Sequence, residues 1–286
     1  EMQQSIPHND CVRYFIGDIR DKERLHRAFE GVDIVVHSAA LKQVEAAEYN
    51  PFECVNTNIL GSENVINAAI DHNVEKVIAL STDKAVNPAN LYGATKLCSE
   101  KLFIAGNHYV GENRQTQLSV VRYGNVVGSR GSVIPLFLKL RKSGVIPVTD
   151  ERMTRFWITL DQAVDFVLTS LKIMNGGEIF VPKIPAMTIT DLVKAIAPEC
   201  KIKNIGIRPG EKLYEIMITE DEARDTSELD DCFVIQPRSV FSSQKKLDGA
   251  RDLPERFKYN SDNTPLRLTQ EDLQAMVLEW QQQNQT

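Results

Sequence analysis

A tyrosine and a lysine four residues apart, Tyr92 and Lys96 in the segment YGATK, could carry out acid and base chemistry. On a helix, side chains with this spacing lie one turn apart on the same face. An ammonium group beside a phenol favours the phenolate and lowers a pKa that is ordinarily about 10, so Tyr92 could accept a proton near neutral pH. The pattern is short, and a surface tyrosine with a solvated lysine is the alternative.

Three further polar residues, Thr82, Asp83 and Lys84, follow the run KVIALS, which has the composition of a buried strand. Ligands bind at the carboxyl edge of open parallel sheets, so this tripeptide would bring a hydroxyl, a carboxyl and an amine to one place. Exposed charges on a strand-end turn are the alternative for Asp83 and Lys84. The YGATK segment that follows favours the catalytic interpretation.

The elements that would position these residues alternate between short β-branched runs and longer amphipathic segments. This alternation predicts an α/β fold with a Rossmann-like, doubly wound parallel sheet and helices on both faces. After Tyr123 the chain becomes rich in glycine, serine and proline, which predicts a smaller C-terminal substrate-binding lobe, whereas the tail from Asp225 has a polar, irregular pattern. The predicted strands are 12–16, 33–37, 76–81 and 118–123, and the predicted helices are 22–29, 46–73, 91–107, 160–174 and 189–197.

The beginning of the sequence lacks a feature that such a domain usually has. A dinucleotide-binding domain opens with a strand, a glycine-rich turn and a helix whose N-terminus holds the pyrophosphate. No such segment precedes Val12. We therefore expect the sequence to begin inside the domain, with the N-terminal strand and glycine-rich turn in roughly 40 to 50 preceding residues.

Other polar segments are ambiguous when taken alone. Asp18 in DIRD could accept a hydrogen bond from an adenine amino group, but an aspartate after a strand could equally cap the helix predicted from Lys22. In HSAALKQV, small alanines would allow a cofactor to approach and Lys42 could reach a phosphate or sugar, although small residues also simply end strands. In RPGEK, Arg208 and Glu211 could bind a diphosphate and hydroxyls, or form a surface ion pair.

Charge and composition exclude several classes of protein. The net charge of -6 argues against broad attraction to nucleic acid or to an anionic membrane, and no apolar run approaches the roughly 20 residues that cross a bilayer. The five cysteines are odd in number and scattered, which predicts neither disulfides nor a metal site. Reduced thiols indicate a soluble protein in a cytoplasmic setting.

Several motifs together resemble the inverting UDP-N-acetylglucosamine 4,6-dehydratases of pseudaminic acid biosynthesis, a group of extended short-chain dehydrogenase/reductases. The likeness runs from about Asp18 to Glu215. Related glucose 4,6-dehydratases carry Thr-Asp-Glu where this chain has Thr-Asp-Lys, and a sister group that also epimerises carbon 5 often has methionine in place of Tyr92. The motifs are DIRD, HSAALKQVEAAEYNP, STDKAVNPANLYGATK, VVRYGNVVGSRGS, RMTRFWITL, GGEIFVPK and IGIRPGEKLYE.

The resemblance implies a self-contained redox cycle on UDP-N-acetylglucosamine. Tyr92 would take the proton of the hydroxyl on carbon 4, with Thr82 beside it, while hydride leaves to NADP. A neutral Lys84 would then remove the proton on carbon 5, and a protonated Asp83 would assist loss of the carbon 6 hydroxyl as water. Hydride return to carbon 6 and reprotonation of carbon 5 from the opposite face would complete the inversion.

The same resemblance implies the remaining site residues and the partners. NADP is expected from the family alone, since the sequence does not exclude NAD, and family members form homo-oligomers, dimers or hexamers. The dinucleotide would bind residues 1–126 with 153–175, and the nucleotide sugar 127–152 with 176–286. Cofactor contacts would come from Asp18, Ile19, Ala39, Leu80, Ser81, Tyr92, Lys96, Val126, Val127, Gly128, Ser129 and Arg130, and substrate contacts from Lys42, Asn125, Val133, Thr149, Arg208 and Glu211.

Two other functions stay open at this point. A nucleotide-sugar 4-epimerase would use Tyr92 and Lys96 but would need neither Asp83 nor Lys84. A non-catalytic dinucleotide sensor on the same fold would have no use for the Tyr92 and Lys96 pair. The fold alone decides between none of these.

Overall fold

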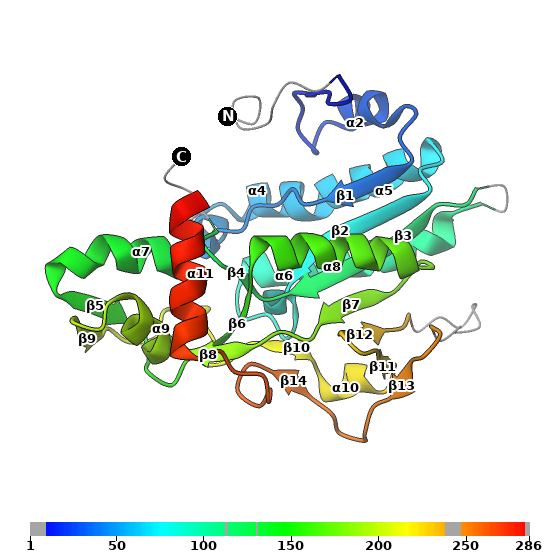
Figure 1. The fold of residues 1–286 in the computed structure, drawn as a ribbon. Coiled ribbons are helices and arrows are strands. Elements are labelled where there is room, and N and C mark those ends of the chain that lie inside the picture. The colour runs from blue at the N-terminus through cyan, green and yellow to red at the C-terminus, as the bar shows by residue number, and fades with distance from the viewer. Residues whose placement is uncertain (1–9, 112–113, 130, 238–246, 284–286) are drawn as a thin grey trace.

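A seven-stranded sheet forms the centre of the protein in the computed structural model, with strand order β1-β2-β3-β7-β12-β11-β13 (Figure 1). The structure describes residues 10–111, 114–129, 131–237 and 247–283. The first four strands are parallel, and the last three add to them antiparallel. The strands are β1 (Ile34–His37), β2 (Lys76–Thr82), β3 (Gln117–Tyr123), β7 (Ile179–Pro182), β12 (Cys232–Ile235), β11 (Thr226–Glu228) and β13 (Arg251–Asp252).

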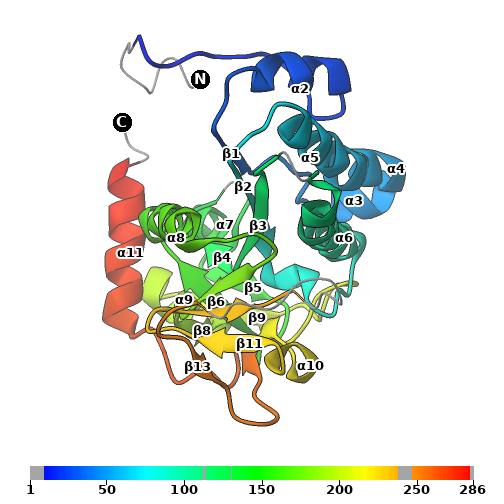
Figure 2. The ribbon, with the colours of Figure 1, turned by 90° about the vertical axis from the view of Figure 1, so that its right-hand side faces the viewer.

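Helices cover both faces of this sheet, which confirms the predicted doubly wound architecture (Figure 2). Helix α8 (Leu160–Ile173) lies on one face, and α5 (Gly61–Asp71) and α6 (Leu91–Gly106) lie on the other. Helix α2 (Lys22–Phe29) packs against α5 and begins at the cap residue Asp21, whose side chain accepts from the Arg24 N–H. Buried valine, isoleucine and alanine side chains of β2, β3 and α5 fill the core between the layers.

A second, smaller core lies beyond the carboxyl ends of the parallel strands and confirms the predicted C-terminal lobe. It brings together α7, β5, α9 and α11, and Trp157 of β6 is 2% exposed in it. The elements of this second core are α7 (Val133–Leu140), η4 (Arg141–Ser143), β5 (Val145–Val148), β6 (Thr154–Ile158), β8 (Ala186–Thr188), α9 (Ile189–Ile196), β9 (Lys201–Asn204) and α11 (Gln270–Gln283). Four further elements pack against the main core instead: β4 (Asn125–Val126), β10 (Ile216–Ile218), α10 (Glu220–Ala223) and β14 (Tyr259–Asn260).

Three sequence predictions of local structure were wrong. Residues 12–16 form no strand, because in the described part of the chain they have no ladder partner beside β1. The single helix expected over 46–73 is divided into α3 (Val44–Tyr49), α4 (Pro51–Val55), the π-helical η1 (Asn56–Leu60) and α5. The tail after Asp225, expected to be irregular, forms β11, β12, β13, β14 and α11, so the segment 176–286 contributes four strands to the main sheet.

Candidate active site

The turn after β2 concentrates the reactive groups. Strand β2 ends at Thr82, and the short 3-10 helix η2 (Asp83–Ala85) follows it directly. The carboxylate oxygen Oδ1 of Asp83 accepts from Thr82 Oγ1 at 2.9 Å and from Lys84 Nζ at 2.9 Å. Asp83 is fully buried, and its second oxygen, Oδ2, has no hydrogen-bond partner among the described residues. One oxygen is thus held by the protein, and the other is left for a ligand.

The protein's own groups favour a charged Lys84, contrary to the expectation of a neutral amine. Burial opposes the ammonium, but the negative charges of Asp83 and then Glu215 outweigh burial and raise the pKa of Lys84. Lys84 Nζ also lies within ion-pair distance of Asp83, at 2.9 Å. In this state of the protein the pair therefore favours the proton on the amine.

Tyr92 and Lys96 lie in the first two turns of α6, as predicted. The helix begins at Asn90, whose side chain accepts from the Gly93 N–H at 2.8 Å. Burial raises the pKa of Tyr92, while the charge of Lys84 and a hydrogen bond with Thr82 act in the opposite direction. The expected lowering of this pKa was wrong in direction, because the sequence does not reveal how deeply the phenol is buried.

Lys96 is held by the backbone of the strand that carries the reactive turn. Its Nζ donates to the carbonyl oxygen of Leu80 at 2.7 Å, and the residue is 5% exposed. Burial lowers the pKa of Lys96 to about 8, against the opposing charge of Glu100 one turn later on α6. Arg122 of β3 donates hydrogen bonds to both carboxylate oxygens of Glu100, at 3.0 and 2.7 Å, so this negative charge is fixed in place.

Two residues that position the site were missed in the sequence. Gly93 allows α6 to touch the reactive turn, because a Cβ there would lie 2.2 Å from the Lys84 carbonyl oxygen. Asn58, buried in the π-helical segment, joins the Leu41 backbone after β1 to Thr95 of α6, with bonds of 2.8 to 2.9 Å. The glycine inside YGATK was the signal available in the sequence, whereas the π-helical segment around Asn58, a feature that often marks a functional site, is seen only in the structure.

Three residues expected to contact the cofactor, Asp18, Ile19 and Ala39, lie before β1 or just after it. Asp18 is exposed and paired with Arg20, whose hydrogen bond lowers the pKa of Asp18. It is therefore not the cap of α2, a role that Asp21 fills. Ile19 packs against Gly61 of α5, and Ala39 is exposed in the segment that follows β1.

The glycine-containing segment after β3 forms a turn beside the reactive edge. Val126 belongs to β4, and the buried Val127 donates its N–H to Ile158 at 2.9 Å. Gly128 has a φ of 69°, and the Ser129 N–H donates back to Val126 at 3.2 Å. The predicted contact Arg130 lies outside the described residues.

Buried polar atoms without partners test whether a nicotinamide group fits this edge. Ser81 Oγ at the end of β2 and Asn125 Oδ1 at the start of β4 are both buried and have no hydrogen-bond partner among the described residues. Such atoms are costly unless a ligand or water satisfies them. Together with Lys96 they form a polar lining that suits a nicotinamide ribose and amide.

The substrate residues predicted from the sequence gather only in part. Arg208 approaches Glu45 of α3 at 3.9 Å, while its backbone N–H donates to Glu211 at 3.4 Å. The alternative interpretation, a side-chain ion pair between Arg208 and Glu211, is therefore not found among the described residues. The loop that carries them meets the reactive segment, since Asn90 donates to the Gly210 carbonyl at 2.9 Å. The others are an exposed Lys42, a half-buried Val133 at the start of α7, and a half-buried Thr149 that donates to the Met153 sulfur.

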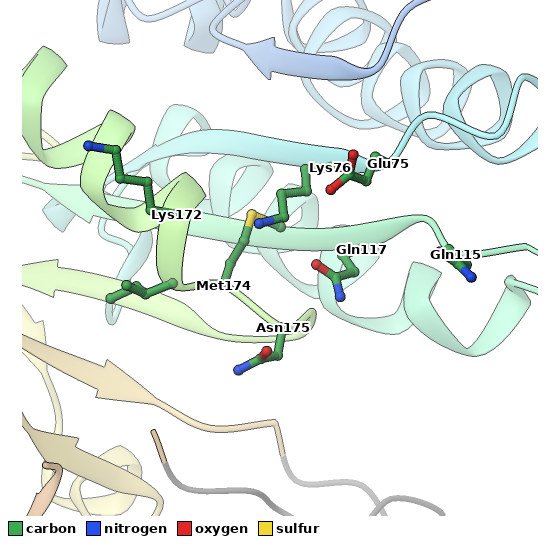
Figure 3. Close-up of a pocket in the computed structure, with 8 residues that line it drawn as sticks. Glu75, Lys76, Gln115, Gln117, Lys172, Met174 and Asn175 are labelled. Carbon is green, nitrogen blue, oxygen red and sulfur yellow. The ribbon is translucent and has the colours of Figure 1, made fainter. Parts of the chain in front are cut away.

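A surface hollow of about 500 Å³ lies at the opposite end of the sheet and is unrelated to this chemistry (Figure 3). Its lining comes from the amino ends of β2 and β3 and from the segment after α8. Lys76 there donates to the Leu171 carbonyl at 2.9 Å, and Met174 is buried. Ligands of parallel sheets bind at the carboxyl ends, where Asp83, Lys84 and Tyr92 lie.

Comparison with known proteins decides the family. The polysaccharide biosynthesis protein family matches residues 1–237. The chain belongs to this family of extended short-chain dehydrogenase/reductases. The UDP-N-acetylglucosamine 4,6-dehydratase (inverting) of Campylobacter jejuni serotype O:2 is 52% identical over 282 residues, which cover 96% of this chain and 84% of that protein. The UDP-glucose 4-epimerase of Rickettsia conorii is 42% identical over 95% of this chain and 81% of its own length.

A solved structure supports the placement of this family member. Pen from Bacillus thuringiensis is 42% identical, with a TM-score of 0.85, over 94% of this chain and 83% of that one. Within the described residues no helix is both long and apolar enough to cross a membrane. The same part of the chain contains no group of three or more residues suited to hold a metal ion.

Proposed function

We propose that this family member is an inverting UDP-N-acetylglucosamine 4,6-dehydratase, a hydro-lyase. The observation that carries the proposal is the Asp83–Lys84 pair at 2.9 Å, next to Tyr92 and at the carboxyl edge of β2. Elimination of water needs one group to take a proton and another to give one. The pair supplies both, and the relative from Campylobacter jejuni, at 52% identity, bears this activity in its name.

The first step is removal of the proton from the carbon 4 hydroxyl. Tyr92 is the acceptor, and the neighbouring Lys84 charge and Thr82 hydroxyl stabilise its phenolate. A nicotinamide dinucleotide, when bound, supplies the acceptor and later the donor of hydride. Lys96, Ser81 and Asn125 would hold that group. The 4-keto sugar that results has an acidic proton on carbon 5.

The second step needs the proton of the pair to move from Lys84 to Asp83. Transfer along the 2.9 Å contact converts the ion pair into a neutral amine and a carboxylic acid without changing the number of protons. Lys84 then takes the carbon 5 proton, and Asp83 gives its proton to the departing carbon 6 hydroxyl. Elimination regenerates the ion pair seen in the structure, so the charged state found here is compatible with the neutral base required by the reaction.

The finer assignments are part of the same proposal. We expect NADP rather than NAD, a homo-oligomeric enzyme, and a product that enters pseudaminic acid biosynthesis and flagellin glycosylation, on the strength of the motifs. The five cysteines are free thiols, which supports a cytoplasmic location. Residues 1–126 with 153–175 would bind the dinucleotide, and 127–152 with 176–286 the nucleotide sugar.

Incubation with UDP-N-acetylglucosamine in deuterated water, without added reductant, tests the proposal by mass spectrometry. We expect a product that has lost one water and has gained one solvent deuterium at carbon 5, because the hydride that returns to carbon 6 comes from the substrate and not from the solvent. An unchanged substrate mass, with a nicotinamide dinucleotide shown to be bound, would contradict dehydration. Matched incubations with UDP-glucose and UDP-N-acetylgalactosamine define the sugar.

A 4-epimerase is the second candidate, because the relative from Rickettsia conorii carries that name at 42% identity. Epimerisation needs Tyr92 and Lys96 but no acid for a leaving hydroxyl. It would convert the sugar without a change in mass, and it would survive replacement of Asp83. The buried pair of Asp83 and Lys84 favours dehydration, since an epimerase gains nothing from it.

A further inference from the structure

Glu215 is a buried carboxylate next to the reactive turn, and the proposed mechanism leaves it without a role. Its side chain is 5% exposed, and it immediately precedes β10, which packs against η2. Its backbone N–H donates to Ser261 Oγ at 3.0 Å, and its carbonyl accepts from the Ser261 N–H at 2.9 Å. The fold therefore fixes the position of the Glu215 carboxylate.

Two cations face Glu215, and one of them also contacts the reactive segment. Lys212 Nζ lies 3.3 Å from Oε2 of Glu215 and donates to the Val86 carbonyl at 2.8 Å. Arg155 Nε lies 3.8 Å from the other oxygen. Oε2 of Glu215 makes no hydrogen bond within the described part of the chain. The carboxylate is thus linked through Lys212 to Val86, the residue after η2, and its Oε2 is held there by an ion pair and not by a hydrogen bond.

We infer that Glu215 is a positioning residue whose fixed negative charge sets how firmly Lys84 holds the proton that it shares with Asp83. The inference rests on the proposed function and deepens it. After elimination Lys84 is an ammonium and Asp83 a carboxylate, so a second negative charge near Lys84 stabilises the state in which the carbon 5 proton has been taken. It also keeps the pair from losing the one proton that Asp83 must give to the leaving hydroxyl.

The direction in which each substitution should shift the pKa of Lys84 follows from the charges that face Lys84, which are those of Asp83, Glu215 and Tyr92. Glu215 contributes to the raised pKa of Lys84, so loss of its charge lowers that pKa. We expect loss of the positive charge of Lys212, which lies 3.3 Å from Glu215, to raise the pKa of Lys84, because the charge of Glu215 would then act on Lys84 without this opposing cation. General damage to the site would not produce two shifts of opposite sign.

Acetylation of Lys84 by acetic anhydride measures its basicity without any need for turnover. The side chain is 25% exposed, and only the neutral amine reacts. At a fixed pH near 10, we expect Glu215→Gln to acetylate Lys84 about tenfold faster than wild type, which corresponds to about one pKa unit. Lys212→Met should acetylate it more slowly, and Glu215→Asp should stay near wild type. Glu220→Gln, which removes a surface carboxylate paired with Lys258, is the matched control.

The catalytic measurement is the rate of dehydration as a function of pH, and the informative part is the alkaline limb, where the rate falls. Above the pKa of Lys84 the pair has lost its proton, so in Glu215→Gln this limb should move down by about one pH unit. A folded Glu215→Gln protein that acetylates Lys84 at the wild-type rate would overturn the inference. If that variant does not fold, an unchanged rate in Lys212→Met overturns it. Failure of the proposed function would instead appear as wild-type protein that removes no water, whatever the acetylation rates.

Discussion

A Cβ atom on Gly93 would lie 2.2 Å from the carbonyl oxygen of Lys84 and 3.1 Å from Pro88 Cβ. The first turn of α6 is therefore pressed against the segment that follows β2. This contact allows Tyr92, on α6, and the Asp83–Lys84 pair, on η2, to share one site. Since Gly93 does not adopt a positive φ, its requirement is for space and not for an unusual backbone conformation.

Replacement of Gly93 by alanine should therefore separate the two halves of the site. The methyl group meets backbone atoms, which cannot yield as a flexible side chain can. We expect Gly93→Ala to lower kcat on the order of 100-fold, because displacements of about 1 Å have effects of this size. Gly111→Ala, with no atom of the described residues within 4 Å of the added Cβ, should match wild type in kcat and Tm. Wild-type turnover by Gly93→Ala would refute the steric argument.

Substitution of the pair should separate oxidation from elimination. In Asp83→Asn and Lys84→Met we expect water loss to fall by at least about 100-fold, because each removes one of the two proton-transfer groups. Binding of dinucleotide should persist in both variants. In Asp83→Asn, which keeps the Lys84 charge beside Tyr92, oxidation at carbon 4 should persist too, so absorbance of reduced nicotinamide should accumulate with substrate. Lys139→Met, an exposed lysine of α7, is the control. Full dehydration by either site variant would contradict the roles assigned to Asp83 and Lys84 in proton transfer.

The parts of the fold that depend on local pattern could be predicted from the sequence. Strands β1, β2 and β3 and helices α2 and α6 lie within a residue or two of the expected ranges, because alternation of apolar runs is a local signal. Residues 12–16 were wrong because a strand also needs a partner, which local sequence does not show. The strands β11, β12 and β13 were missed since their pairing joins distant segments to β7.

The positions of the reactive residues were predicted better than their charge states. Thr82, Asp83, Lys84 and Tyr92 meet as expected, because the first three are consecutive at the carboxyl end of β2 and α6 begins in contact with η2. Burial raises the pKa of Tyr92, whereas the raised pKa of Lys84 depends on Asp83 and on Glu215, which overcome burial. Glu215 stands more than 120 residues further along the chain. Spacing along a sequence carries no such information.

Burial of Lys96 should make stability depend on pH between about 8 and 10.5. Its pKa is about 8 in the folded protein, against 10.5 as the ordinary value. Between these limits the unfolded chain binds more protons than the folded one, so the free energy of unfolding rises with pH. Below about pH 8 the cost of the buried charge is fully present, and it amounts to at most about 3 kcal/mol at 1.4 kcal/mol for each pKa unit.

Chemical denaturation at several pH values between about 7 and 10 measures this dependence. Wild type should gain stability over the window, and Lys96→Met should show a flatter curve with higher stability at pH 7. Lys101→Met, an exposed lysine on the same helix, should keep the wild-type slope. Equal slopes in wild type and Lys96→Met would show that Lys96 stays solvated, contrary to its 5% exposure.

The turn at Gly128 is tied to the C-terminal helix in a way that a double-mutant cycle can measure. A Cβ on Gly128 would lie 1.8 Å from Nε1 of Trp280 on α11, and the φ of 69° adds strain for any other residue. In wild type we expect Gly128→Ala to cost about 3 kcal/mol, roughly 1 kcal/mol from the backbone and the rest from overpacking. In a Trp280→Ala background only the backbone part should remain, a coupling of about 2 kcal/mol.

Because Val126 to Ser129 are proposed to contact the cofactor, Gly128→Ala should also weaken dinucleotide binding, measured by calorimetry. The same cost in both backgrounds would mean that Trp280 moves aside freely and does not hold the turn.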